Sequence, residues 1–145
     1  MNNYPSWWNC TITVYNRYED STGLITWYRT VVPNCFWKYV GDTVTVGETT
    51  LETNSTICRV PIDKNFVEKF EWIALEDKSS KFTFGVDDIV VLGEVDDVID
   101  EYESGKRSSD LLIKYHNLQG CMKVVRCSIN VGGGRGNEHY YIKGI

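Results

Sequence analysis

The sequence is a succession of short runs rich in β-branched and aromatic residues, each ended by turn-forming residues. Residues 10–17 (CTITVYNR) alternate between two faces, which predicts a half-buried strand. The turn-rich segment 18–23 separates it from a second run at 24–32, so we expect a hairpin. Ala occurs once, at Ala74, whereas a helical bundle of this length would use many more Ala residues. The pattern therefore predicts a mostly-β chain.

The same alternation of strand runs and turns continues along the chain. Pro33 and Asn34 are expected to end the second strand. Residues 66–75 fit a helical and an extended pattern alike, and we favour a turn followed by a strand at 71–75. Further strands are expected at 35–40, at 43–46 and 49–53 around Gly47 and Glu48, at 56–60, from 82 onward, and at 89–92, 121–131 and 139–142.

Two segments carry apolar residues at helical spacing. The acidic stretch 94–103 has them at i, i+3, i+4 and i+7, which indicates a short helix or helical turn. The clearer helix lies near 109–118, with Ser108 or Ser109 as N-cap and Asp110 in the first turn. We therefore predict a single domain over residues 1–145, a small β-barrel or a sandwich with this short helix across one face, and projecting loops.

Charge and cysteine content narrow the function classes. The chain has 145 residues and a net charge of -5, which argues against a general nucleic-acid coat but leaves room for a local basic patch. No two of the five cysteines are separated by two residues, the spacing of a zinc knuckle or a redox motif. We therefore expect buried thiols in a reducing cytoplasm. The N-terminal segment lacks a leader pattern, and no apolar run is long enough to span a membrane.

The groups that could carry chemistry have simpler structural readings. The carboxylates at 94–103 lack the spacing of a calcium loop, so a solvated face or a partner contact is preferred to a metal site. Cys121, Cys127, His116 and His139 form no recognisable catalytic motif. The glycine loop 132–137 precedes a strand and lacks a phosphate-binding Lys, so it is read as a hairpin connection. We expect that the chain is not an enzyme and that it binds no cofactor and no metal.

Several surfaces are candidates for contacts with other proteins. Trp7 and Trp8 precede the first strand, and residues 1–9 are expected to form an arm that docks onto a neighbouring subunit. Lys106 and Arg107 follow an acidic run, an arrangement that suits contact between identical subunits. Arg135, at the tip of the glycine loop, and the nearby His139 are candidates for contact with a partner.

Six segments together resemble a family of small neck proteins of tailed bacteriophages and prophages. These segments span residues 8–17, 29–38, 44–53, 57–61, 93–111 and 134–145. The resemblance covers nearly the full chain and implies a head-completion, stopper-like connector. Such proteins form a ring beneath the portal and close or gate the DNA channel before the tail attaches.

The resemblance implies a homo-oligomeric ring in the virion neck, assembled in the bacterial host cytoplasm. Its partners would be a portal or adaptor protein on one side and a tail or tail-terminator protein on the other, with DNA passing without sequence reading. The hairpin 41–56 is expected to face the channel, where its acidic charge would let DNA slide. Its channel residues would be Asp42, Thr45, Gly47, Glu48 and Glu52. The competing readings are a small β-barrel binding module for nucleic acid or carbohydrate, or another minor capsid or tail-completion protein.

Overall fold

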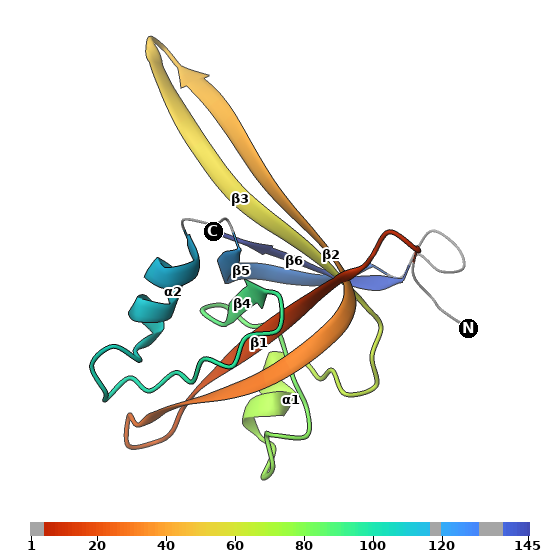
Figure 1. Ribbon diagram of the computed structural model, residues 1–145, viewed down its shortest axis with the longest axis vertical. Helices are drawn as coiled ribbons and strands as arrows, with labels where there is room; N and C mark the ends of the chain where they lie inside the picture. The colour runs from red at the N-terminus through yellow and green to blue at the C-terminus, as the bar shows by residue number, and fades with distance from the viewer. Residues whose placement is uncertain (1–4, 117–119, 131–137) are drawn as a thin grey trace.

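A computed structural model describes residues 5–116, 120–130 and 138–145, without the side chains of 41–45, 50–54 and His116. Over these residues the elements run β1 (Cys10–Glu19), β2 (Ile25–Val46), β3 (Thr49–Pro61), α1 (Lys69–Ile73), β4 (Ile89–Leu92), α2 (Ser108–His116), β5 (Cys121–Asn130) and β6 (His139–Gly144). The strands form a closed antiparallel barrel in the order β1-β2-β3-β6-β5-β4 (Figure 1). The predicted β-barrel with a short helix is confirmed.

Strand β2 is longer than predicted because Pro33 and Asn34 bend it instead of ending it. Cys10 pairs with Cys35 and Ile12 with Val32, so β2 holds one more residue than β1 over this stretch. Asn34 adopts a φ of 63°, a left-handed conformation that Asn tolerates and that β-bulges use. The strands predicted at 24–32, 35–40 and 43–46 are therefore one strand. Likewise, those predicted at 49–53 and 56–60 are both parts of β3.

Three other predictions about local structure are wrong. The segment 71–75 is not a strand, because Lys69–Ile73 forms the short helix α1 that buries Trp72. The acidic stretch 94–103 is not helical and crosses the barrel surface as a loop with isolated turns. The strand expected from residue 82 is a single parallel bridge between Phe82 and Phe66. In each case tertiary contacts override a weak local pattern.

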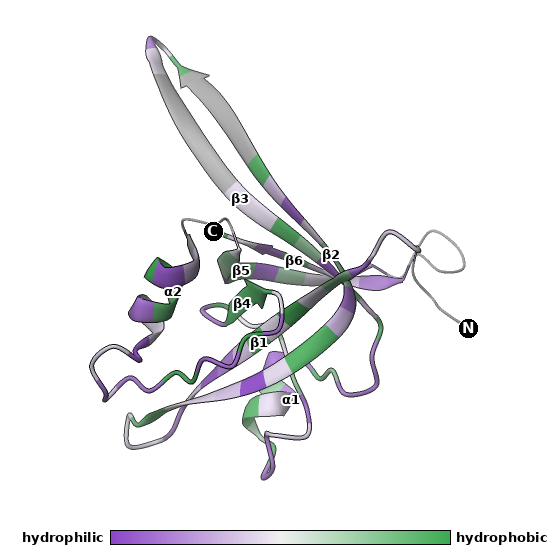
Figure 2. Cartoon of the chain, viewed as in Figure 1, coloured by the Kyte–Doolittle hydropathy of each residue, from purple (hydrophilic) through white to green (hydrophobic). Residues whose placement is uncertain are grey.

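The barrel wall is buried on both sides along β1. Ile12 and Val14 point into the barrel interior, where they join Val90, Met122 and Ile142 in the main core. The prediction of a half-buried strand is wrong, because the opposite face of β1 is also covered. Its Tyr15 packs with Ile89, Ile99, Leu111 and other residues in a second cluster beneath the segment 93–107 and α2. Figure 2 shows this covering segment as largely hydrophilic on its way to α2.

The β2–β3 hairpin extends far beyond the barrel. Strand β1 begins at Cys10, opposite Cys35, and β6 pairs with β3 only between Thr56 and Pro61. Within the part of the chain that the structure describes, residues 41–54, which we call the arm, are therefore paired only with each other, around a turn at Gly47 whose φ of 64° suits glycine. Figure 1 shows the arm projecting as a two-stranded ribbon. Within the described residues no helix is long and apolar enough to cross a membrane.

Candidate functional site

A groove lies where the wall of the barrel is incomplete. Strand β5 pairs with β4 only from Cys121 to Lys123, whereas its pairing with β6 continues to Asn130. Among the described residues, no backbone hydrogen bond joins positions 125–130 to a strand on the β4 side. This half of β5 is therefore an open edge, a row of unpaired backbone groups that can template another strand.

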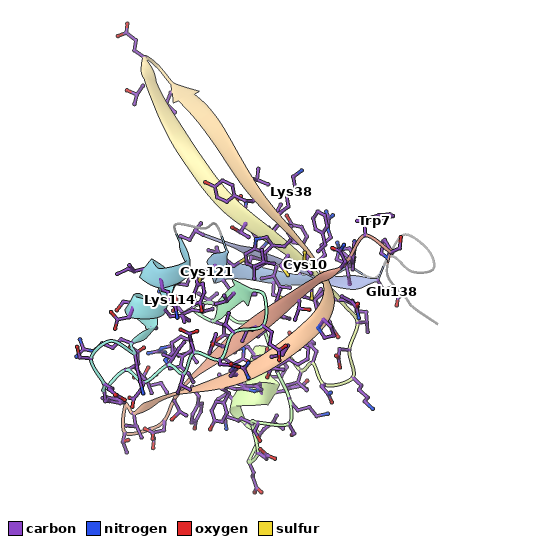
Figure 3. The ribbon with its side chains drawn as sticks, in the orientation of Figure 1. Trp7, Cys10, Lys38, Lys114, Cys121 and Glu138 are labelled. Atoms are coloured by element: carbon purple, nitrogen blue, oxygen red, sulfur yellow. The ribbon has the colours of Figure 1, made fainter. Side chains whose placement is uncertain are left out.

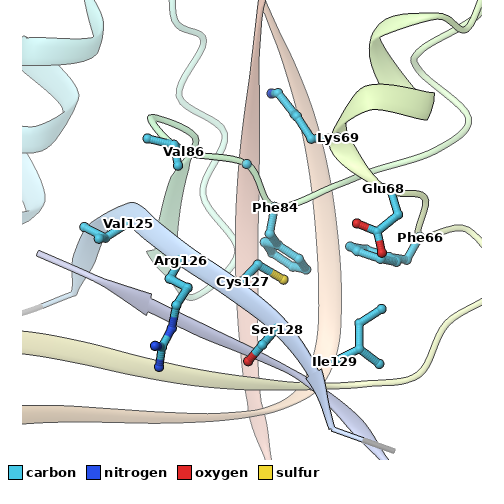
Figure 4. Close-up of a pocket in the computed structure, with 11 residues that line it drawn as sticks. Phe66, Glu68, Lys69, Phe84, Val86, Val125, Arg126, Cys127, Ser128 and Ile129 are labelled. Carbon is cyan, nitrogen blue, oxygen red and sulfur yellow. The ribbon is translucent and has the colours of Figure 1, made fainter.

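The groove beside this edge has a volume of about 710 Å³ and an apolar floor. Its floor contains Phe66 and Phe84, whose rings stack with centroids 6.0 Å apart, and Phe66 also stacks on Tyr140 at 4.0 Å. Figure 4 shows Phe66, Phe84 and Cys127 on one side of β5, with Arg126 pointing the other way. The rim carries the exposed residues Glu68, Val86 and Ile129.

The cysteine in the groove is not set up as a nucleophile. Burial, together with the nearby carboxylate of Glu68, raises the pKa of Cys127 to about 12, so the thiol stays protonated at neutral pH. Burial alone raises the pKa of Cys121 to about 12. Cys121 belongs to the second cluster, outside the barrel, and Cys127 packs against the main core inside it. The wall formed by β5 therefore separates the two residues.

One end of the groove lies near the N-terminal segment. Trp8 is buried by its own chain, with its ring edge-on to that of His139 at 5.4 Å, and His139 in turn contacts the Asn130 amide at 3.1 Å. Trp7 is 66% exposed and points away from the barrel (Figure 3). Of the tryptophan pair predicted to dock on a neighbour, only Trp7 is presented to the surface.

The other predicted contact residues do not come together. Lys106 forms an exposed ion pair with Glu103 at 3.5 Å, and Arg107 is exposed at the start of α2. At the tip of the arm Glu48 is exposed, beside the turn glycine Gly47. The side chains of Asp42, Thr45 and Glu52, and the whole of Arg135, lie outside the described residues.

The acidic stretch has a structural use in the covering segment. Asp97 accepts hydrogen bonds from the Lys114 ammonium at 2.7 Å and the Tyr115 hydroxyl at 2.6 Å, which tie this segment to α2. Burial opposes ionisation of Asp97, but these two bonds outweigh it and lower the pKa of the carboxyl. Asp96 pairs with Arg29 of β2 at 3.5 Å. These carboxylates thus hold the covering segment on the barrel.

Tyr15 makes this cover sensitive to alkaline pH. Its hydroxyl donates to the backbone oxygen of Asp97 at 2.6 Å, and burial, then the Asp97 charge, raises the pKa of Tyr15 from 10.0 to about 12. Because the folded protein favours the neutral hydroxyl, Tyr15 contributes stability that is fully present below pH 10. This contribution is lost as the pH rises toward 12. We expect urea unfolding to show a loss of stability in this window that Tyr15→Phe reduces. An equal pH dependence in both proteins would contradict the assignment.

Sequence reasoning did not find the groove, although one signal was present. The run 121–131 is much longer than the run 89–92, so a barrel that pairs them must leave part of the longer strand unpaired.

Comparison with known proteins identifies a family but no activity. The model of a family of unknown function, DUF6751, matches residues 7–145. No curated protein and no solved structure matches the chain.

Proposed function

We propose that this chain, which belongs to the DUF6751 family, is a structural subunit of a phage neck. In this role it is a stopper-like connector that forms a homo-oligomeric ring between the portal and the tail and helps to close or gate the DNA channel. The ring assembles in the bacterial host cytoplasm and remains in the virion neck. A portal or adaptor protein contacts one side, and a tail or tail-terminator protein contacts the other.

The observation that carries this proposal is the arm. A two-stranded ribbon is marginally stable in water, so a ribbon whose strands pair only with each other is better explained by an assembly than by a monomer. Among the described strands, residues 41–54 pair only with each other, although the chain has ample apolar residues for a core elsewhere. A neighbouring protein that pairs with or covers the arm supplies the contacts that such a ribbon needs. The resemblance to phage neck proteins supplies the particle in which that neighbour is found.

The open edge of β5 supports the same role. Soluble monomers usually protect a free strand edge with a charge, a Pro or a covering segment. Here the edge runs beside an apolar groove, and Ile129, which lines this groove, is 41% exposed. In the assembled ring we place a strand of a second copy against this edge. Arm and edge lie on different parts of one subunit, so they make a head-to-tail contact of the kind that closes rings.

A charged edge is expected to disrupt the ring. Ile129→Lys places an ammonium on the open edge, where burial beneath a neighbouring strand is costly, and should weaken self-association by about tenfold or more. Ile113→Lys makes the same change on an exposed position of α2 and should leave assembly unchanged. Sedimentation of the full chain across a concentration series, alone and with portal protein, measures both variants.

The outcomes test the connector role and the contact at the β5 edge separately. Rings from the wild-type chain, seen directly by electron microscopy, support the connector. A wild-type chain that stays monomeric at every concentration and with the portal rules the connector out. Rings that tolerate Ile129→Lys rule out the β5 edge as the contact.

The competing candidate is a small β-barrel binding module, and the groove is the observation that favours it. A pocket of about 710 Å³ with an aromatic floor is of the size that holds small ligands. Such a module stays monomeric in the same sedimentation experiment and retains a ligand through purification. Native mass spectrometry of the purified chain detects that ligand.

A further inference from the structure

Four cations lie on the outer face of one part of the barrel. The inward positions of β2, β3, β6 and β5 include Cys35, Cys58 and Ile142 in the main core, with Cys127 packed against it. The alternate positions on the same strands therefore face outward. The cations among them are Lys38 on β2, Arg59 on β3, Lys143 on β6 and Arg126 on β5.

The strand register sets these cations in two adjacent rows. One row runs from Lys38 through Ile57 and Lys143 to Arg126, because each residue pairs with the next across the sheet. Three strand spacings make this row about 14 Å long, the length of about four nucleotides of one DNA strand. The second row runs Phe36, Arg59, Tyr141 and Ser128. Figure 3 shows Lys38 at the base of the arm.

None of these cations is neutralised within the described part of the chain. Lys38, Lys143 and Arg126 are exposed, and none of the four takes part in an ion pair there. The Arg59 guanidinium lies over the rings of Phe36 at 5.3 Å and Tyr141 at 5.7 Å, and its buried Nε has no hydrogen-bond partner among the described atoms. The outward positions of both rows hold no carboxylate. A protein with a net charge of -5 has thus gathered unpaired cations on one sheet face.

We propose that this face, which we call the basic face, binds the phosphate backbone of nucleic acid without reading its sequence. Cations held at fixed positions on a rigid sheet, three of them within one row, match a polymer with closely spaced negative charges. An anionic membrane is a poorer match, because the apolar residues of this face, Phe36 and Ile57, are half-buried and do not protrude. The proposal concerns the isolated chain and does not rest on the connector role.

The salt dependence of binding tests the basic face. Anisotropy of a labelled DNA duplex of arbitrary sequence, titrated with the full chain, should give weak binding at low salt. Four phosphate contacts predict a slope of log K against log salt of about -3.6. The double variant Lys38→Ala, Lys143→Ala should make the slope shallower by about two and lower the affinity in proportion.

A second double variant controls for the change in net charge. Lys64→Ala with Lys81→Ala removes two cations from the loops before and after α1, outside the four strands of the basic face, and changes the net charge equally. It should leave the slope within about half a unit of wild type, and circular dichroism should show that both variants are folded. Equal losses in the two variants, no DNA binding at low salt, or tighter binding to phosphatidylserine vesicles than to DNA would each overturn the proposal.

Discussion

Replacing Asp88 by Asn is expected to lower the free energy of unfolding by about 3–5 kcal/mol, a large share of the stability of a domain of this size. The Asp88 carboxylate is fully buried and accepts hydrogen bonds from four groups. These are the backbone N–H of Arg17 at 2.8 Å, that of Gly85 at 2.8 Å, the Asn16 amide at 3.0 Å and the Lys69 ammonium at 2.9 Å.

The expected cost follows from what the substitution leaves behind. An Asn amide turns a donor toward groups that are themselves donors, so at least one buried N–H loses its acceptor. It also removes the negative charge beside the Lys69 ammonium, whose stem packs against Gly85. Since these partners come from β1, α1 and the turn before β4, the substitution loosens three elements together.

The neighbouring residue provides the matched control. Asp87 has a side chain that is 56% exposed and only a long ion pair, 3.5 Å from Lys123. Its φ of 76° is one that Asn also tolerates, so Asp87→Asn makes the same chemical change without strain. Urea unfolding at neutral pH should show a change within about 0.5 kcal/mol for this variant. Equal stabilities of the two variants would show that the buried network is dispensable.

Trp72→Ala is expected to cost about 3–5 kcal/mol, because it removes a large, fully buried ring from beneath α1. The ring lies edge-on to Tyr28 at 5.5 Å and to Tyr18 at 6.3 Å, and the Lys69 ammonium lies over it at 4.6 Å. A helix of five residues has little stability of its own, so this side chain fixes α1 on the barrel.

Phe70 on the same helix is the control for Trp72. It is 71% exposed, so Phe70→Ala should change the free energy of unfolding by about 0.5 kcal/mol or less. Thermal unfolding followed by near-ultraviolet circular dichroism measures both variants. A Trp72→Ala protein as stable as Phe70→Ala would mean that α1 is not part of the cooperative unit.

The elements predicted correctly are those whose pattern is local and strong. Alternation identified β1, and the turn after it identified the hairpin with β2. The apolar stripe and Asp110 in the first turn identified α2, and the apolar runs identified β4 and β5. The predicted N-cap at Ser108 or Ser109 is wrong, because Ser108 is already helical and the Arg107 carbonyl accepts the first helical hydrogen bond, from the N–H of Leu111. The failures at α1 and at residues 94–103 share one cause. Both segments are short, and their conformation depends on the side chains they cover more than on their own propensity.

The candidate surfaces divide in the same way. Exposure of Trp7 and the turn at Gly47 follow from local sequence, but the burial of Trp8 against His139 depends on two segments far apart in the chain. The groove exists because β4 is shorter than β5, and its aromatic floor comes from segments that pair only at one bridge. Local sequence patterns do not encode contacts between segments that are far apart in the chain.

By itself, the sequence determined that this chain is a β-rich domain with one clear helix, because alternation and capping are properties of neighbouring residues. Only the tertiary structure decided which strands are adjacent, and therefore what the charged residues do. Asp88 reads as a turn residue until the fold surrounds it with donors from three elements. Lys38, Lys143 and Arg126 lie on three different strands, and the register of four strands sets them in one row.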